Sequence, residues 1–290
     1  MTPFEIAEPH TLREAVSLLD ADDPTIRPLG GGTALMLMMK AGVFEPAKLV
    51  SLRSVEPRYS EIKVEGDGSI RIGALTPLAA LEHSKDIADK LPVITRTMPL
   101  LSNVRVRNVA TVGGALAHGD PHMDLPPIMI ALGATVIVLG PKGERSIPMG
   151  ELITGYYETQ LAKNELISEV VVPPQAGKRS VYLKCTTRAA HDWPALGVAV
   201  TVAGGAGGVT DTNIVVSAAT DRAIRLDKAS KLLKGRRPDA TLLGEAGEAA
   251  AAEVEPMDDS QGSAAYKREL VRVYVERALR QALEIGGTAQ

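Results

Sequence analysis

The chain has 290 residues, 45% of them hydrophobic and 23% charged, which is typical of a globular protein large enough for two domains. A net charge of −3 and an aromatic content of 3% argue against nucleic-acid binding, which uses a basic surface and stacked aromatic rings. The sequence shows neither an apolar run that could span a membrane nor a secretory signal, so we expect a cytoplasmic protein. Its one cysteine, Cys185, excludes both an internal disulfide and an iron–sulfur cluster held by this chain alone.

The first 55 residues predict a small βαβ unit with a glycine turn. Residues 11–14 (Thr-Leu-Arg-Glu) form a capping box, which predicts a helix directly after it. Residues 26–29 predict a strand that runs into Gly30-Gly31-Gly32. Thr33 is a suitable N-cap for a helix through Lys40, and residues 48–52 predict the next strand.

The segment from residue 56 to 176 mixes strands and short helices. Apolar residues alternate with polar ones over residues 62–72, around Gly66-Asp67-Gly68, which predicts a hairpin. Thr76-Pro77 is typical of an N-cap followed by proline at the first helical position, so helices are expected over residues 77–98. Further elements are expected as a buried helix at 125–132 and strands at 134–139 and 170–172.

Residues 173–178 (Pro-Pro-Gln-Ala-Gly-Lys) are the clearest candidate domain boundary, because two rigid prolines are followed by a flexible segment that contains a glycine. Beyond them the pattern predicts three strands and then only helices, at residues 181–185, 197–202, 214–218, 226–233, 240–252 and 264–283. In the last helix, Leu270, Val273, Tyr274 and Ala278 form an apolar stripe. We therefore predict an α+β fold with domains at 1–176 (subdomains about 1–55 and 56–176) and 177–290, the second a three-stranded sheet plus helices.

Two glycine clusters have the character of a ligand site. Consecutive glycines expose backbone N–H groups, permit a positive φ and can hold an anion, especially at a helix N-terminus. Gly30-Gly31-Gly32-Thr33 runs from a strand into a helix, and Thr111-Val112-Gly113-Gly114 adds a hydroxyl to a second bare turn. Asp124 follows, where it can accept hydrogen bonds from sugar hydroxyls. Two such turns in one domain suggest a dinucleotide held at two points.

Other interpretations of these residues remain open. Neither a Walker phosphate loop nor the Gly-x-Gly-x-x-Gly fingerprint is present, so on spacing alone the glycines fit a structural turn as well as a phosphate site. His118 and His122 have the spacing of zinc ligands on a helix, but Gly119 and Pro121 between them disfavour a regular helix. The alternative for His118 is that it lines the pocket or packs against the turn.

The segment from Arg107 to Pro126 resembles the FAD-binding medium subunit of the molybdenum hydroxylases, the family of carbon monoxide dehydrogenase and xanthine dehydrogenase. That family has the pattern Arg-Asn-x-Gly-Thr-Ile-Gly-Gly-Asn, then Asp-Pro and Asp-Leu-Pro, and this chain carries most of it. Residues 30–35 (Gly-Gly-Gly-Thr-Ala-Leu), Lys184 with Arg188 and Asp192, and the tail residues 231–235, 255–256 and 262–270 are also similar to the family. The resemblance therefore covers nearly the whole chain.

The resemblance implies a PCMH-type, two-subdomain FAD-binding domain with FAD as cofactor. The positions that match the family's cofactor contacts are Gly30, Gly31, Gly32, Thr33, Ala34, Leu35, Asn108, Thr111, Val112, Gly113, Gly114, Ala115, Ala117, His118, Asp120, Asp124, Ile167 and Lys184. By this match the glycine segments hold the pyrophosphate and Asp124 a flavin-chain or ribose hydroxyl. Ile167 packs on the isoalloxazine, and Lys184 approaches its pyrimidine end. Without the resemblance, Lys184 is an ordinary solvated strand lysine.

The chain departs from the family pattern at three positions. Ala115 stands where an asparagine is usual, so one side-chain hydrogen bond is lost, and Ala110 and Gly119 replace a common glycine and alanine. Trp193, the only tryptophan, lies in the segment that covers the flavin face in relatives. It is either that cover or a core residue that anchors the second domain.

The resemblance implies an electron-transfer subunit with no catalytic residue or metal ligand of its own. A large molybdopterin-binding subunit oxidises the substrate, and a small subunit with two [2Fe-2S] clusters passes electrons to the FAD, which reduces NAD, quinone or oxygen. The implied assembly is a heterotrimer or a dimer of heterotrimers. One alternative is a free-standing FAD oxidase or reductase, which His118 keeps open, and another is a non-catalytic nucleotide-binding subunit or one that has lost FAD.

Overall fold

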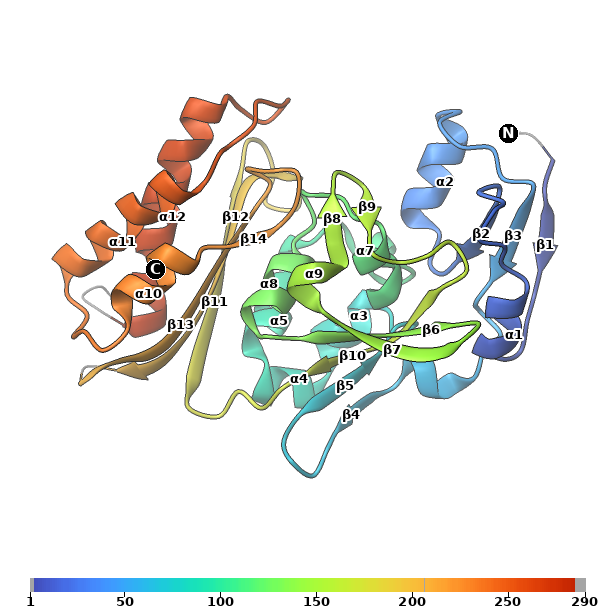
Figure 1. Cartoon of the computed structure of the whole chain (residues 1–290), viewed down its shortest axis with the longest axis horizontal. Helices are drawn as coiled ribbons and strands as arrows, with labels where there is room; N and C mark the ends of the chain where they lie inside the picture. Colours follow the sequence, from blue (N-terminus) through green and yellow to red (C-terminus); the bar gives the residue numbers. More distant parts are fainter. Residues whose placement is uncertain (1–2, 206, 285–290) are drawn as a thin grey trace.

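The computed structural model describes residues 3–205 and 207–284, which form three main sheets with helices packed against each (Figure 1). The α+β class is confirmed. Each sheet belongs to one stretch of the chain, and Figure 1 shows them side by side, from the blue N-terminal sheet through the green centre to the yellow and red C-terminal part.

The N-terminal sheet is parallel, with strand order β1-β3-β2. Its strands and helices are β1 (Glu5–Ala7), α1 (Leu12–Ser17), β2 (Ile26–Leu29), α2 (Thr33–Lys40) and β3 (Lys48–Ser51). The βαβ prediction is therefore confirmed. The Thr11 hydroxyl caps α1 by accepting from the Glu14 N–H at 3.0 Å, whereas the Glu14 carboxylate accepts from the N–H of His10, one residue earlier than a capping box requires.

The glycine turn enters α2 one residue earlier than predicted. Gly32, not Thr33, is the N-cap, with a φ of 71°, and Thr33 is the first helical residue. A positive φ is readily adopted only by glycine, so this turn depends on Gly32. No side chain caps the helix, which leaves its first N–H groups without a side-chain acceptor.

The central sheet is antiparallel, with strand order β4-β5-β10-β6-β7. Its strands are β4 (Ile62–Val64), β5 (Ile70–Gly73), β6 (Thr135–Gly140), β7 (Gly143–Pro148) and β10 (Leu166–Val172), and β8 (Ile153–Gly155) pairs separately with β9 (Glu158–Thr159). The helices of this part are the 3₁₀ turns η1 (Pro57–Ser60) and η2 (Met98–Leu100), and α3 (Leu78–His83), α4 (Lys85–Lys90), α5 (Pro92–Thr97), α6 (Val104–Arg107), α7 (Val112–Ala117), α8 (Leu125–Ala131) and α9 (Met149–Leu152).

The predicted hairpin, the helical region after residue 77 and the buried helix at 125–132 are confirmed in this part. One detail is wrong: Pro77, whose ψ of 145° is extended, is itself the N-cap of α3. Thr76 serves α7 instead, since its carbonyl accepts from the Val112 N–H at 3.0 Å.

The C-terminal sheet has the order β11-β12-β13-β14 and is covered by helices. Its elements are β11 (Lys178–Thr186), β12 (Pro194–Gly205), β13 (Gly208–Ser217), β14 (Ile224–Arg225), α10 (Asp227–Leu233), α11 (Ala240–Glu253) and α12 (Ala264–Leu283). The predicted three strands are thus joined by a fourth, and the prediction of only helices after residue 218 is wrong. β14 has two residues, too few for an alternating pattern in the sequence.

The buried stripe of α12 also differs from the prediction. Of the four predicted residues only Ala278 is buried, and the buried set is Lys267, Val271, Val275, Ala278, Leu279 and Ala282. The helix lies between α11 and the β11–β12 face, so its rotation follows from packing on both sides and from the anchoring of Lys267.

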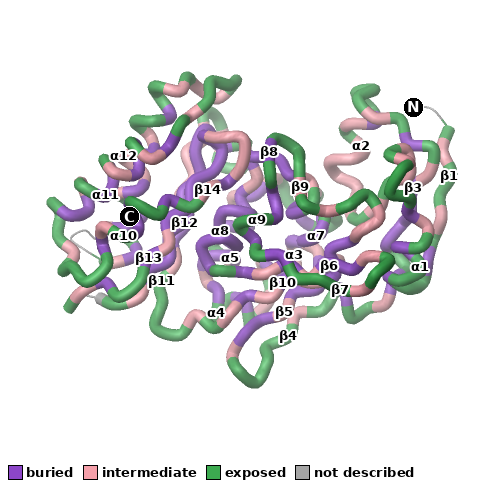
Figure 2. The backbone as a smooth tube through the Cα atoms, in the orientation of Figure 1, coloured by how far each residue is buried: buried purple, intermediate pink, exposed green. Residues whose placement is uncertain are grey.

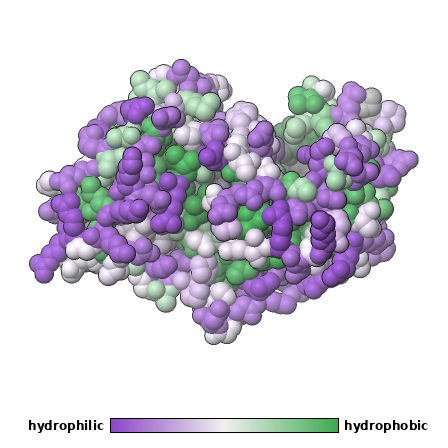
Figure 3. Space-filling model, in the orientation of Figure 1, coloured by the Kyte–Doolittle hydropathy of each residue, from purple (hydrophilic) through white to green (hydrophobic). Residues whose placement is uncertain are grey.

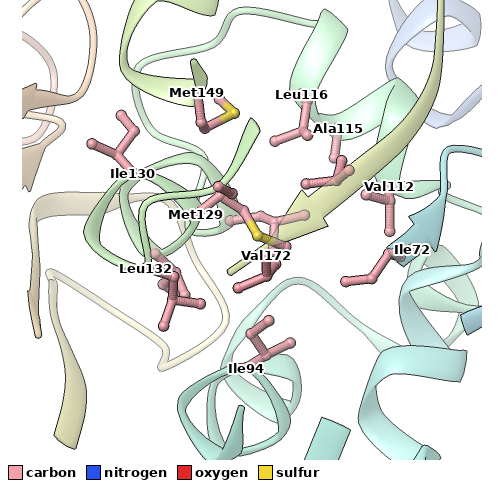
Figure 4. Packing of buried hydrophobic residues seen from close by; sticks show 14 of the residues in the cluster. Ile72, Ile94, Val112, Ala115, Leu116, Met129, Ile130, Leu132, Met149 and Val172 are labelled. Carbon is pink, nitrogen blue, oxygen red and sulfur yellow. The ribbon is translucent and has the colours of Figure 1, made fainter. Parts of the chain in front are cut away.

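Three apolar cores correspond to the three sheets. The central core contains residues of β5, β10, α5, α7 and α8, and Figure 4 shows Met129 beside Val172 and Val112 beside Ile72. In Figure 2 the buried stretches follow these central strands and helices, whereas α2 is mostly intermediate or exposed. The two helices that carry the glycine clusters therefore differ in burial. α7 packs into the central core, whereas most of α2 is only partly covered by the rest of the chain.

Candidate functional site: a two-segment glycine cradle

The two glycine clusters come together in the fold. The position of a Cβ on Gly31 would lie 1.9 Å from the Val109 carbonyl oxygen, and that of a Cβ on Gly30 would lie 2.9 Å from the Thr111 hydroxyl. Segments about 80 residues apart in the sequence are thus in backbone contact, and glycine is what allows it. We call residues 30–35 and 108–115 together the glycine cradle.

The two halves of the glycine cradle differ in their free hydrogen-bond donors. At α7 the Val112, Gly113 and Gly114 N–H groups donate to the Thr76 carbonyl, the Ala74 carbonyl and the Thr111 hydroxyl, at 3.0, 2.7 and 3.2 Å. At α2 no side chain fills this role. Of the two halves of the glycine cradle, the first turn of α2 therefore has the N–H donors suited to a pyrophosphate. The N–H groups of α7 are already bonded, so this helix contributes a fixed surface instead.

The residues of α7 divide into a core face and an open face. Val112, Gly113 and Ala115 are buried, and a Cβ on Gly113 would lie 2.7 Å from the Ala74 Cβ, so Gly113 serves the packing of α7 on the end of β5. Gly114 and Ala117 are exposed. Among the other predicted positions, Asn108 is exposed at the end of α6, and Thr33, Ala34 and Leu35 are half-buried on α2.

The surface beside the glycine cradle is hollowed. In Figure 1, α2 stands apart from the β8–β9 hairpin, with α7 between them, and Figure 3 shows a notch at the same place. Apolar side chains of α2 line its upper rim, and Leu37 is 67% exposed. A cavity of about 460 Å³ between α8, β7 and β14 lies elsewhere, and none of the predicted site residues is among the described residues that line it.

Asp124, at the start of α8, and Lys184, on β11, form a buried ion pair. The Lys184 Nζ lies 2.9 Å from the Asp124 Oδ2 and donates to the Leu100 carbonyl at 2.9 Å, and the Tyr182 hydroxyl donates to Asp124 Oδ1 at 2.7 Å. Burial raises the pKa of Asp124, against the opposing effect of Lys184 and Tyr182. Both carboxylate oxygens thus have partners within the chain, and one Lys184 proton remains for a further acceptor.

Ile167 lies on β10, where it is 7% exposed and part of the central core. His118 is half-buried with its ring edge-on to Tyr157, 5.0 Å between centroids, and burial lowers its pKa. His118 is therefore predominantly neutral at pH 7, which suits a residue that lines a pocket.

Sequence reasoning did not recognise a chain of charges next to the glycine cradle. His122 Nδ1 lies 3.2 Å from Asp120 Oδ1, and its Nε2 lies 3.0 Å from Asp259 Oδ2. Lys267, fully buried, donates to Asp259 at 2.6 Å. We call Asp120, His122, Asp259 and Lys267 the interdomain charge chain. Its only local signal in the sequence is the Asp-Pro-His motif, because Asp259 is 137 residues from His122.

The histidines of residues 118–124 do not converge on one point. His118 contacts Tyr157, while His122 faces Asp120 and Asp259. Within residues 3–205 and 207–284, no group of three or more metal-binding side chains is placed to hold an ion, and no helix is long and apolar enough to cross a membrane.

The interdomain charge chain predicts a pH dependence of stability. Burial disfavours the charged form of His122, but hydrogen bonds to Asp120 and Asp259 outweigh it and raise its pKa above the ordinary 6.5. A raised folded-state pKa means that this stabilisation is fully present below pH 6.5 and is lost as pH rises through the folded value. We expect the free energy of unfolding, measured by urea titration, to fall across that interval, and His122→Gln to remove the fall. An equal slope in both proteins would contradict this.

Two known protein-family models match the chain. Residues 2–175 match the model of the FAD binding domain in molybdopterin dehydrogenase, and residues 181–282 match the CO dehydrogenase flavoprotein C-terminal domain. The first match covers more than half of the chain. The protein belongs to this family of FAD-binding subunits. It is accordingly an oxidoreductase subunit whose cofactor is FAD.

The relatives resemble the chain over its full length. It is 32% identical to the carbon monoxide dehydrogenase medium chain of Hydrogenophaga pseudoflava, over 96% of each chain. It is 28% identical to the glyceraldehyde dehydrogenase medium chain of Sulfolobus acidocaldarius, over 96% of this chain and 98% of that one. The solved carbon monoxide dehydrogenase of H. pseudoflava superposes with a TM-score of 0.92 at 34% identity, covering 97% of this chain and 98% of that one. Quinoline 2-oxidoreductase from Pseudomonas putida 86 superposes with a TM-score of 0.91 at 27% identity, covering 98% of each chain.

Proposed function

We propose that the chain is the electron-transfer subunit of a molybdopterin-dependent hydroxylase or dehydrogenase. A large molybdopterin-binding subunit oxidises the substrate, and a small subunit with two [2Fe-2S] clusters passes the electrons on. This subunit delivers them to an external acceptor, which is NAD, quinone or oxygen. The observation that carries the proposal is the full-length likeness to medium chains of two different dehydrogenases. The single Cys185 supports it, because the clusters must then be held by another polypeptide.

The same proposal includes the assembly and the domain limits. The complex is a heterotrimer, or a dimer of heterotrimers, located in the cytoplasm. The FAD-binding domain occupies residues 1–176, with subdomains of about 1–55 and 56–176, and the C-terminal domain occupies 177–290. The family matches that end at residue 175 and begin at residue 181 support a division in the linker between β10 and β11.

The residues present fit an FAD. When bound, FAD supplies a centre that accepts electrons in pairs or singly. The uncapped first turn of α2 offers N–H donors for the pyrophosphate, and the absence of a side chain on Gly30 lets this turn approach the Thr111 hydroxyl. Gly114 and Ala117 present a face of α7 without bulky side chains.

We propose that three residues with buried side chains, Asp124, Ile167 and Lys184, contact the flavin ring and the flavin chain. We propose that Lys184, held by Asp124, approaches the pyrimidine end of the flavin, where its positive charge favours the anionic reduced form. We propose that Asp124 also accepts from a flavin-chain or ribose hydroxyl and that Ile167 packs on the isoalloxazine. Asp120 orients the loop from which His118 lines the pocket, since it accepts from the backbone N–H of His122 at 2.8 Å.

A glycine on the open face of α7 tests the cradle without disturbing the core. A Cβ on Gly114 would meet only the Thr111 hydroxyl, at 3.0 Å, and alanine is the better helix former by about 1 kcal/mol. We expect Gly114→Ala to keep its free energy of unfolding within about 1 kcal/mol of wild type. Its FAD dissociation constant should rise about tenfold, roughly 1.4 kcal/mol, as flavin fluorescence titration would show.

The matched control is Gly244→Ala, a helical glycine of α11 with no heavy atom within 4 Å of the position of its Cβ. It should leave FAD affinity unchanged, and its free energy of unfolding, like that of Gly114→Ala, should stay within about 1 kcal/mol of wild type. Wild-type FAD affinity in Gly114→Ala would refute the assignment of this face to the ligand.

Affinity purification of the tagged chain from its native host tests the function. We expect two further polypeptides in the purified complex, with molybdenum by elemental analysis and [2Fe-2S] signals by electron paramagnetic resonance. Dithionite reduction followed by rapid mixing with NAD, a quinone or oxygen then identifies the acceptor by flavin reoxidation. A yellow chain that purifies alone and turns over a small substrate would overturn the proposal in favour of a free-standing FAD oxidase or reductase. A colourless chain would favour a non-catalytic subunit.

A further inference from the structure

His122 is clamped between two carboxylates that come from different parts of the chain. Asp120 lies two residues before it, and Asp259 precedes α12 in the C-terminal part. His122 is 9% exposed, so water competes little at its two ring nitrogens. Each ring nitrogen faces a carboxylate oxygen within hydrogen-bond distance.

This geometry requires the imidazolium form. A neutral imidazole has one N–H and one lone pair, so one of the two contacts would direct a lone pair at a carboxylate. With His122 protonated, the four members of the interdomain charge chain carry two negative and two positive charges. With His122 neutral, the same four side chains carry one uncompensated negative charge.

Trp193 is stacked on this imidazole. The ring centroids are 5.4 Å apart and the planes differ by 18°, although 54% of the tryptophan is exposed to solvent. A cation over the face of an indole is attracted by its π electrons. The exposed indole therefore depends on the charge of His122 for much of its attachment.

The surroundings of His122 are themselves fixed. Lys267 donates to the Ala218 carbonyl at 2.7 Å, and the Ala218 N–H donates to the Pro121 carbonyl at 3.0 Å. The Tyr157 hydroxyl donates to Asp120 Oδ2 at 3.2 Å. Tyr157 holds Asp120 and Lys267 holds Asp259, so both partners of the imidazole are fixed. Of the two stacked rings, the exposed indole of Trp193 is therefore the one that can move.

We propose that His122 is a positioning residue whose imidazolium, held by Asp120 and Asp259, keeps the Trp193 indole against residues 118–124 of the FAD-binding part. Loss of the His122 proton releases the indole into solvent. The charged and titratable groups that face this site are Asp120, His118 and Tyr157 from the FAD-binding part and Asp259 and Lys267 from the C-terminal part. The inference concerns the chain's own side chains and holds whether or not the electron-transfer proposal is correct.

The intrinsic fluorescence of Trp193 tests this directly, because it is the only tryptophan. The measurements are emission and acrylamide quenching of the full-length chain, with its FAD and after FAD removal, from pH 5.5 to 9. A protonated histidine quenches a stacked indole, so emission and acrylamide accessibility should both rise in a single-proton step with a midpoint above 6.5. His122→Gln should abolish the step. Asp259→Asn should lower its midpoint by about one pH unit or more, since one of the two carboxylates is lost.

His191→Gln is the matched control, since His191 is exposed and two residues from the indole. It should leave the step unchanged. The proposal is overturned if wild type shows no step, if the step persists in His122→Gln, or if it vanishes in His191→Gln. The Asp259→Asn variant keeps the test decisive if His122→Gln does not fold, because an unshifted midpoint also overturns it. None of these results depends on partner subunits or on turnover.

Discussion

The Gly31→Ala variant should be isolated without bound FAD. A Cβ at this position would lie 1.9 Å from the carbonyl oxygen of Val109, 2.6 Å from its carbonyl carbon and 2.7 Å from the Ala110 Cα. All three are backbone atoms, so no side-chain rotation relieves the clash, and the two halves of the glycine cradle must separate. The ratio of flavin to protein absorbance after purification, and the FAD dissociation constant, measure the effect. We expect affinity to fall by at least tenfold, roughly 1.4 kcal/mol.

The matched control for Gly31→Ala is Gly66→Ala in the β4–β5 hairpin. No heavy atom lies within 4 Å of the position of a Cβ on Gly66, so its FAD content should equal that of wild type. Urea unfolding of both variants separates a local defect from a global one. Full FAD content in Gly31→Ala would show that the two segments do not need their close approach to hold the cofactor.

Removing the Lys184 charge should cause the largest loss of stability. Its side chain is 4% exposed and that of Asp124 6%, so the Lys184→Met variant leaves a buried carboxylate without its cation. Breaking one side of a buried ion pair costs about 3–5 kcal/mol. We expect the free energy of unfolding to fall by about this amount, and the pKa of Asp124, already raised by burial, to rise further.

A double variant and a control complete this test. In Lys184→Met with Asp124→Asn the stranded charge is absent, so most of the lost stability should return. Lys178→Met, at the exposed start of the same strand, should change stability by at most about 0.5 kcal/mol. A loss of less than about 1 kcal/mol in Lys184→Met would mean that the pair is solvated rather than buried. Flavin spectra of Lys184→Met then report whether the same charge also acts on bound FAD.

Local patterns in the sequence were sufficient for most secondary structure. The Thr11 cap, the Gly66–Gly68 hairpin turn and the buried helix from Leu125 are short-range features, and each is present in the fold. Two errors occur where packing between elements decides the structure and the local pattern does not. β14 exists because it pairs with β13, and the rotation of α12 follows from α11, the sheet and Lys267.

In the candidate site, too, some features follow from the local sequence and others only from packing. Its two glycine segments and Asp124 stand out as residue types suited to a nucleotide, and the family resemblance that they support is confirmed by the matches over both parts of the chain. The unequal roles of the glycines were not predictable. Gly31 meets Val109, Gly113 meets Ala74, and Gly114 faces outward, and only the packed fold distinguishes these environments.

The sequence by itself determined the family and the cofactor, because the residues that identify them lie in contiguous motifs. Only the tertiary structure decided that Thr76 and Ala74 accept from the N–H groups of Val112 and Gly113, that Lys184 is buried against Asp124, and that His122 joins Asp120 to Asp259 beneath Trp193. These are interactions of buried polar groups, whose strength depends on exclusion of water. The partner of a buried charge is set by how separate segments pack, and its distance along the chain carries no information about that packing.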